Sequence, residues 1–311
     1  MHTIKYTTSG LAILSCLLWS TAFVGVKIGL RYSDPFSFAG IRFMLSGIML
    51  IPFWWGHRPS WQEMSGNIRV LVLVSLFQTF FTYALFYKGI SLVSGAVAAI
   101  IIGASPLTAA VVAHFTMKDD SMSVAKSFSL LIGLSGVALI SVSRLPWLSP
   151  SGLGEFIGIG LLFFCTVASA VANVLVAREK KDLDPIFLNS VQIFLGGFLL
   201  LVLSFLVEGK AELITAPQYY YALLWLSFLS AVSISLWFVL LKRPGVKISQ
   251  LNVWKFIIPV FGAILSWTLL PEESPSFVPL LGMACIAVAI VGYNVADNGF
   301  TRFIPVKRGK K

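Results

Sequence analysis

Ten apolar stretches follow one another along this chain, and each is long enough to cross a lipid bilayer. A helix rises 1.5 Å per residue, so about 20 apolar residues span the roughly 30 Å hydrocarbon layer. Inside that layer backbone polar groups must bond within the protein, which favours helices. The sequence therefore predicts an all-α membrane protein with ten transmembrane helices, at residues 10–30, 36–55, 68–90, 94–117, 125–143, 155–177, 187–207, 218–241, 249–270 and 276–296.

The composition excludes a water-soluble protein. Hydrophobic residues make up 57% and charged residues 12% of the chain, against about a quarter charged residues in soluble domains. The ten stretches leave only short connections, so there is no room for a soluble domain. The cysteines lie within apolar stretches and are predicted to be buried thiols, not a disulfide framework: Cys16, Cys165 and Cys285.

Matching residues recur at a nearly constant offset in the two halves of the chain. Asp34-Pro35 precedes one apolar stretch and Asp184-Pro185 precedes another 150 residues later, while Pro106 and Pro259 lie 153 residues apart. A five-helix unit crosses the membrane an odd number of times, so a second copy enters from the opposite side. We predict two inverted five-helix repeats, residues 1–147 and 148–300, followed by a basic cytoplasmic tail, residues 301–311.

Lys and Arg are distributed unevenly between alternate connections. Of the 23 such residues, three lie inside apolar stretches: Lys27, Arg42 and Lys255. Four lie in connections on one side: Arg31, Lys88, Arg144 and Lys210. The other 16 lie on the opposite side, which the positive-inside rule assigns to the cytoplasm. Both termini are therefore expected to be cytoplasmic, in a bacterial inner membrane, and the net charge of +10 reflects this bias and not a nucleic-acid partner.

Cations at membrane depth need a physical reason, because an ionisable side chain there costs about 2.5–3.5 kcal/mol. Lys27 and Arg42 lie near outer helix ends, where we expect them to reach the headgroups or, for Arg42, Asp34. Lys255 lies deeper, and Asn252, three residues earlier, is expected on the same helix face. No Asp or Glu lies in the interior of a stretch, so an acidic group of a substrate would supply the partner of Lys255. Snorkelling towards the cytoplasm is the alternative.

Polar and aromatic residues at helical spacing complete a predicted substrate site. Ser169 and Asn173 lie on one helix face, and the 150-residue offset relates them to Trp19 and Phe23. Such residues also hold membrane helices together, which is the alternative interpretation. The predicted substrate-binding residues are Lys255, Asn252, Asn173, Gln78, Trp19, Phe23, Ser169 and Tyr83. Pro106 and Pro259 are predicted hinges, and Trp237 and Trp254 are interpreted as interfacial or lipid-facing residues.

Four segments carry a resemblance to a known family. They are LLWSTAFVGVKIGL (17–30), DPFSFAGIRF (34–43), SLVSGAVAAIIIGASPLTAAVVAHFTMKDD (91–120) and, more loosely, KISQLNVWKFIIPVFGAILSWTLLPEE (247–273). Through these four segments the chain resembles the drug/metabolite transporter superfamily, in particular its EamA-type members, which have ten helices in two repeats. The Gly-Glu pair usual at the end of the fourth helix of each repeat is replaced here by Lys118-Asp119 and Pro271-Glu272. The resemblance implies a transporter of small metabolites, often an exporter, with a central cavity between the repeats.

These observations predict a secondary transporter that moves a small anionic or zwitterionic metabolite, such as an amino acid or organic acid, by alternating access. Export of drug-like or cationic compounds is one alternative, although it usually requires a buried carboxylate, and a non-transporting structural membrane protein is another. No catalytic residues, metal site or cofactor are expected, since His2, His57 and His114 are scattered. The expected partners are a small-molecule substrate and the lipid bilayer, for a monomer or homodimer.

Overall fold

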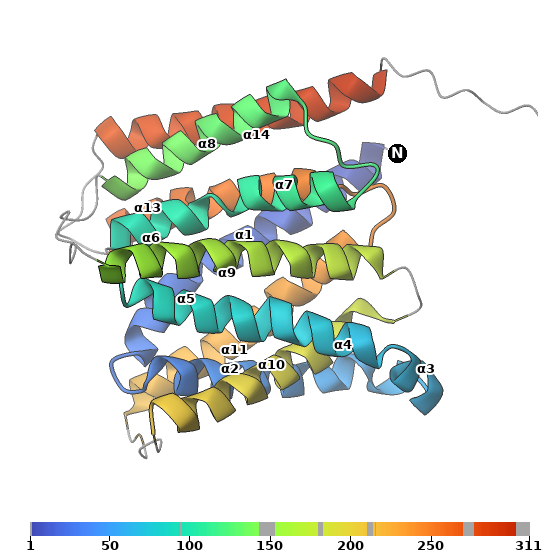
Figure 1. The fold of residues 1–311 in the computed structure, drawn as a ribbon, viewed down its shortest axis with the longest axis vertical. Helices are drawn as coiled ribbons and strands as arrows, with labels where there is room; N and C mark the ends of the chain where they lie inside the picture. Colours follow the sequence, from blue (N-terminus) through green and yellow to red (C-terminus); the bar gives the residue numbers. More distant parts are fainter. Residues whose placement is uncertain are drawn as a thin grey trace, which may run out of the picture.

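The structure is a bundle of helices (Figure 1). The computed structural model describes residues 2–93, 95–142, 153–179, 183–209, 214, 216–269 and 277–302, and all regular structure in these ranges is helical, which confirms the all-α class. The elements are α1 (His2–Gly29), α2 (Pro35–Trp54), η1 (Trp55–His57), α3 (Trp61–Gly66), α4 (Ile68–Val74), η2 (Ser75–Phe81), α5 (Thr82–Ile90), α6 (Gly95–Gly103), α7 (Ser105–Thr116), α8 (Val124–Val142), α9 (Leu153–Arg178), α10 (Pro185–Val207), α11 (Pro217–Leu241), α12 (Ile248–Val253), η3 (Trp254–Phe256), α13 (Ile257–Leu269) and α14 (Phe277–Arg302).

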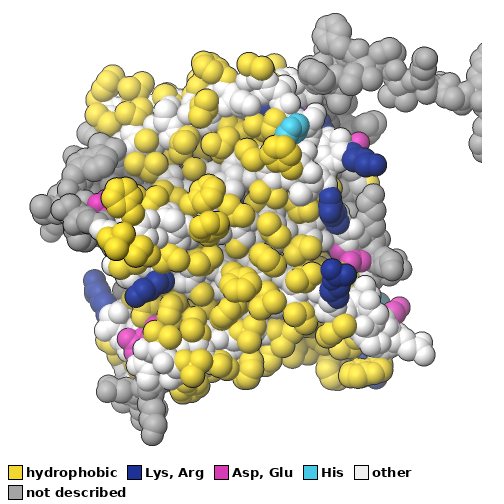
Figure 2. All heavy atoms as spheres, viewed as in Figure 1, with side chains coloured by type: hydrophobic (Ala, Val, Ile, Leu, Met, Phe, Trp, Pro, Cys, Tyr) yellow, Lys and Arg dark blue, Asp and Glu magenta, His cyan; other side chains and the backbone are white. Residues whose placement is uncertain are grey.

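Several helical segments are suited to a bilayer. Six in the described part of the chain are long and apolar enough to cross it: Pro35–His57, Ile68–Ile90, Leu153–Arg178, Pro185–Val207, Pro217–Leu241 and Phe277–Asp297. Shorter apolar helices cover Thr8–Ala22 and Val124–Ile140. Figure 2 shows hydrophobic side chains across the middle of one face, with Lys and Arg towards the two ends of the helices. These helices indicate a polytopic membrane protein. The number of ten crossings stays a prediction.

The two remaining predicted stretches are interrupted helices. α6 ends at Gly103 and α7 begins at Ser105, with Pro106 in its first turn. The 3₁₀ turn η3 joins α12 to α13, and Pro259 lies in the first turn of α13. A proline lacks a backbone N–H and its ring clashes with the carbonyl four residues earlier, so a regular helix ends before it. Each interruption accordingly lies just N-terminal to its proline.

Glycines allow α2 and α10 to pack closely. A Cβ on Gly40 would lie 3.0 Å from the carbonyl oxygen of Gly197, and a Cβ on Gly197 would lie 3.0 Å from that of Gly40. Further along α2, a Cβ on Gly47 would lie 2.8 Å from the carbonyl oxygen of Ser190. Since higher numbers on α2 meet lower numbers on α10, the two helices are antiparallel.

A second glycine contact joins α8 and α14. A Cβ on Gly136 would lie 2.6 Å from the carbonyl oxygen of Gly282, and one on Gly282 would lie 2.7 Å from that of Gly136. Each of these glycines also faces a side chain of the other helix: Gly136 faces Ile286, and Gly282 faces Ile140. Figure 1 shows this antiparallel pair at one side of the bundle and the α2–α10 pair at the other, with α1, α7, α9 and α13 between them.

Both ends of the described chain lie at the same end of the bundle. In Figure 1 the first turn of α1 and the last turn of α14 lie at the same end of the helices, and so does the loop from α7 to α8. α2 begins at the opposite end, where Glu208 caps it by accepting hydrogen bonds from the backbone N–H groups of Phe36 (2.9 Å) and Ser37 (3.0 Å). α10 is capped by Asp184, which accepts from Ile186 and Phe187.

Candidate functional site

Lys255 lies inside the bundle, at the interruption between α12 and α13. Its ammonium Nζ is 4.9 Å from the centroid of the Trp237 ring on α11 and 5.7 Å from that of the Trp19 ring on α1. The two indoles contact each other, with their ring centroids 5.1 Å apart. A cation above aromatic faces is stabilised by their quadrupoles, by more when desolvated than in water. The side chain therefore points into the bundle, which argues against snorkelling.

Trp237 belongs to this site, although the sequence suggested an interfacial or lipid-facing residue. Its side chain is 1% exposed. Its indole Nε1 is buried and has no hydrogen-bond acceptor within the described ranges. A single tryptophan in an apolar run has no neighbouring pattern that would reveal which helix face it occupies. The structure thus adds an unused N–H donor beside the ammonium of Lys255.

Asn173 and Asn252 form a buried pair one helical turn from Lys255. The Asn173 amide nitrogen donates to the Asn252 side-chain oxygen at 3.2 Å, and Asn252 donates to the Ile248 carbonyl at 2.9 Å. Both side chains are at most 1% exposed. This bond joins α9 to α12, so the fold pairs Asn173 with Asn252, which precedes Lys255 by three residues.

The other predicted site residues lie at different places. Ser169 is half-buried on α9, one turn before Asn173, and Trp19 is the indole beside Lys255. Gln78 lies in the π-helix η2, with its side-chain oxygen buried and no hydrogen-bond donor among the described residues. Tyr83 packs against Phe43, with ring centroids 4.4 Å apart. Phe23 belongs to α1, but its side chain lies outside the described part, as does that of Lys27.

Arg42 corrects an expectation, because its guanidinium turns towards aromatic rings instead of Asp34 or the headgroups. Its Cζ lies 4.3 Å from the Phe43 ring centroid and 5.5 Å from that of Tyr83. The residue is 5% exposed. Nε and Nη1 are buried and have no hydrogen-bond acceptor in the described part of the chain. Arg42 is therefore a second buried cation, not a surface residue.

A separate polar network is fully paired and joins three elements. The Thr79 hydroxyl of η2 donates to the Gln192 oxygen of α10 at 2.8 Å, and the Gln192 nitrogen donates to the Asn189 oxygen at 2.8 Å. Asn189 in turn donates to the Ser235 hydroxyl of α11 at 2.8 Å. The residues that recur between the two halves of the sequence did not predict this network. Because its amide donors and acceptors are used internally, we assign it to helix packing.

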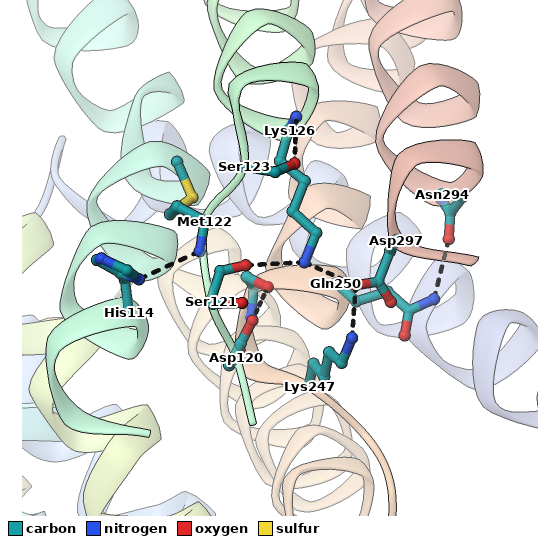
Figure 3. Close-up of polar contacts among 11 residues, drawn as sticks. His114, Asp120, Ser121, Met122, Ser123, Lys126, Lys247, Gln250, Asn294 and Asp297 are labelled. Atoms are coloured by element: carbon teal, nitrogen blue, oxygen red, sulfur yellow. Dashed lines mark hydrogen bonds and ion pairs between the residues drawn. The ribbon is translucent and has the colours of Figure 1, made fainter. Parts of the chain in front are cut away.

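Charged residues link several elements at the end of the bundle where the chain ends lie (Figure 3). Asp120, before α8, accepts hydrogen bonds from the backbone N–H of Ser249 (2.8 Å) and from its hydroxyl. Asp297 of α14 receives Lys126 at 2.7 Å and Lys247 at 2.6 Å. These contacts tie the α7–α8 loop, α8, α12 and α14 together. Both carboxylates are nearly inaccessible, with exposures of 3% and 5%.

The interior is therefore electropositive between the helix ends. The described residues contain no group of three His, Cys, Asp or Glu side chains that could hold a metal ion. Lys255 and Arg42 form no ion pair with an Asp or Glu of the described part. A cation against aromatic rings, with a free N–H donor on one of them, is an arrangement that can attract a small anion.

Comparison with known proteins agrees with this architecture. The model of the EamA-like transporter family matches residues 8–142 and 156–295. The chain is 23% identical to the uncharacterized transporter YoaV of Bacillus subtilis, over 83% of this chain and 86% of that protein. It is 26% identical to an uncharacterized transporter of Synechocystis, over 93% and 91%. It is 28% identical to a chloroplastic WAT1-related protein of Arabidopsis thaliana, over 90% and 67%.

A solved crystal structure has the same fold. It superposes with a TM-score of 0.79 over 95% of this chain and 99% of that chain, at 17% identity. The family and the names of the relatives indicate a transporter rather than an enzyme. Since the family match extends over most of both halves, this chain is an integral membrane protein of the EamA-like transporter family, within the drug/metabolite transporter superfamily.

Proposed function

We propose that this protein is a secondary transporter of a small anionic or zwitterionic metabolite, such as an amino acid or organic acid. The observation that carries the proposal is Lys255, a cation inside the bundle that has aromatic neighbours but no acidic partner in the described part. The unused N–H of Trp237 belongs to one of these rings, and Asn252, which is paired with Asn173, lies one helical turn before Lys255 along the chain. An acidic group of the solute would complete this site, and the low dielectric strengthens the attraction.

An inverted repeat would place this site between two related halves, residues 1–147 and 148–300. The family match to residues 8–142 and 156–295 supports such a division. The antiparallel pairs α2–α10 and α8–α14 support it as well, because their contacts are reciprocal. Equivalent helices related by a two-fold axis in the membrane plane run in opposite directions, whereas an axis along the membrane normal would make them parallel.

Alternating access would require the interrupted helices to bend. The interruptions at Ala104 and at η3 each precede a proline, and Lys255 itself lies in η3. The Asp120 and Asp297 contacts would then hold the cytoplasmic end closed while a solute enters from the other side. The protein would act in a bacterial inner membrane, with both termini cytoplasmic.

Export of cationic compounds is less well supported. Such a function would call for a free carboxylate inside the bundle to attract the cation. The buried carboxylates among the described residues are Asp120 and Asp297, and both lie at the end of the bundle. Asp297 is paired with Lys126 and Lys247, while Asp120 is bonded to Ser249. A cation inside the bundle would also be repelled by two positive side chains, Lys255 and Arg42.

Replacing Lys255 with Met should abolish transport of the acidic solute. Amino acids and organic acids are first screened as substrates in proteoliposomes, and the initial rates of the best substrate are then compared between variants. We expect at least a tenfold loss for Lys255→Met, equal to about 1.4 kcal/mol of lost stabilisation. Lys255→Arg should keep part of the rate, since it retains the charge. Lys88→Met, at an exposed position, is the matched control. Normal transport by Lys255→Met would overturn the proposal.

Maleimide labelling tests the inverted topology. In a background without Cys16, Cys165 and Cys285, single cysteines are introduced by Arg144→Cys and Lys210→Cys, or by Lys180→Cys and Arg243→Cys. A membrane-impermeant reagent should label the first two in intact cells and the second two only after the membrane is opened, because of the positive-inside bias. Labelling of the cysteine at position 180 from outside would contradict the predicted orientation.

Replacing the prolines tests the hinges. Pro106→Ala and Pro259→Ala restore a backbone N–H and remove the ring that interrupts the helix. We expect each variant to slow transport by several-fold more than it weakens substrate binding, measured as the shift of the melting temperature with solute concentration. Pro217→Ala is the control, because that proline starts α11 without interrupting it. Wild-type rates in both hinge variants would show that the interruptions serve packing alone.

A further inference from the structure

Arg42 is a buried cation that, like Lys255, has no acidic partner among the described residues. The guanidinium lies over the rings of Phe43 and Tyr83, and its Nε and Nη1 have no hydrogen-bond acceptor among the described residues. A buried charge whose hydrogen bonds are unmade is strongly unfavourable. A group that is absent from the protein chain itself would satisfy these donors.

The acids near the start of α2 do not serve this purpose. Asp34 precedes Arg42 by eight residues, or about 12 Å along a helix. The two carboxylate oxygens of Glu208 accept hydrogen bonds from the backbone N–H groups of Phe36 and Ser37. Those amides lie at the start of α2, more than one turn from Arg42. Both acids therefore belong to the helix end and leave the guanidinium unpaired.

Several other buried polar side chains of this protein are paired within the chain. Lys126 and Lys247 share Asp297, and the amides of Gln192 and Asn189 are bonded to each other and to neighbouring helices. A cation kept only for packing would gain from such a partner. Arg42 and Lys255 share a different arrangement: each charge lies against two aromatic rings and has no acidic partner in the described part of the chain. This shared arrangement points to a ligand at both places.

We infer that Arg42 forms a second anion-binding site, for a carboxylate group of the transported solute, in the half of the bundle remote from the chain ends. Arg42 is seven residues from the start of α2, which lies at that remote end. Lys255 is eight residues beyond Lys247, which lies in the network at the opposite end. The two cations thus lie towards opposite ends of the bundle, as they would if one anion bound first to one and then to the other. The planar guanidinium fork matches a carboxylate, and the rings of Phe43 and Tyr83 suit a flat organic acid.

Benzoate is the probe for this site, because it combines a carboxylate with one flat ring, and benzamide is its neutral control. The inference rests on the proposed transport function for the role of the site, but binding is measured without transport. The full chain is purified with Lys255→Met, so that any remaining anion response does not arise from Lys255. The melting temperature is followed against benzoate and benzamide concentration at constant ionic strength.

The expected result is saturable stabilisation by benzoate and not by benzamide. The further change Arg42→Met should weaken that response at least tenfold, while the melting temperature without ligand stays the same or rises, because an unpaired charge has been removed. Arg42→Lys keeps the charge and loses the fork, and it should show an intermediate response. If Arg42→Met does not fold, the benzoate response of Arg42→Lys tests the inference in its place.

Two outcomes would overturn the inference. If Arg42→Met lowers the melting temperature and leaves the benzoate response unchanged, the residue acts in packing. If phosphatidylglycerol, compared with phosphatidylcholine, stabilises the protein through Arg42 while benzoate does not, the cation binds a lipid headgroup. Failure of the Lys255 transport test would leave the benzoate result unaffected, so the two claims fail separately.

Discussion

The ammonium of Lys255 lies against two indole rings inside a helical bundle, where the low dielectric makes an unpaired charge costly. This interaction connects three separate parts of the chain. Trp19 comes from α1, Trp237 from α11, and Lys255 from the turn between α12 and α13. Cation–π contact offsets part of the cost, and the free indole N–H of Trp237 leaves room for one more interaction. In the proposed function, an acidic solute would supply both the charge and the acceptor.

The helix interruptions and the glycine contacts have complementary roles around this site. Gly40 with Gly197, and Gly136 with Gly282, bring backbone against backbone, so these helix pairs cannot separate or slide without losing close contacts. The interruptions before Pro106 and Pro259 lie between these pairs, and their close glycine contacts are with side chains: Gly103 meets Val137, and Gly133 meets Phe256. A rigid frame at the two sides of the bundle and bendable helices between them is an arrangement suited to alternating access.

Much of the fold was predictable from the sequence, because long apolar runs leave few alternatives to helices. The partnership of Asn173 with Asn252 and Lys255 followed from polar residues at membrane depth, which need partners. The surroundings of Arg42 and Trp237 did not follow, since they depend on how each helix is rotated about its axis. The capping of α2 by Glu208 instead of Asp34 was also missed, because it joins residues 172 positions apart. Periodicity identifies a helix face, but packing decides what that face meets.

The most direct test of the central claim is a structure of the protein with a transported carboxylate solute bound. The account predicts the acidic group within about 4 Å of the Lys255 ammonium, the distance of an ion pair, and within hydrogen-bond reach of the Trp237 indole nitrogen. A solute bound with its acidic group away from Lys255, or a Lys255 side chain directed into lipid, would contradict it.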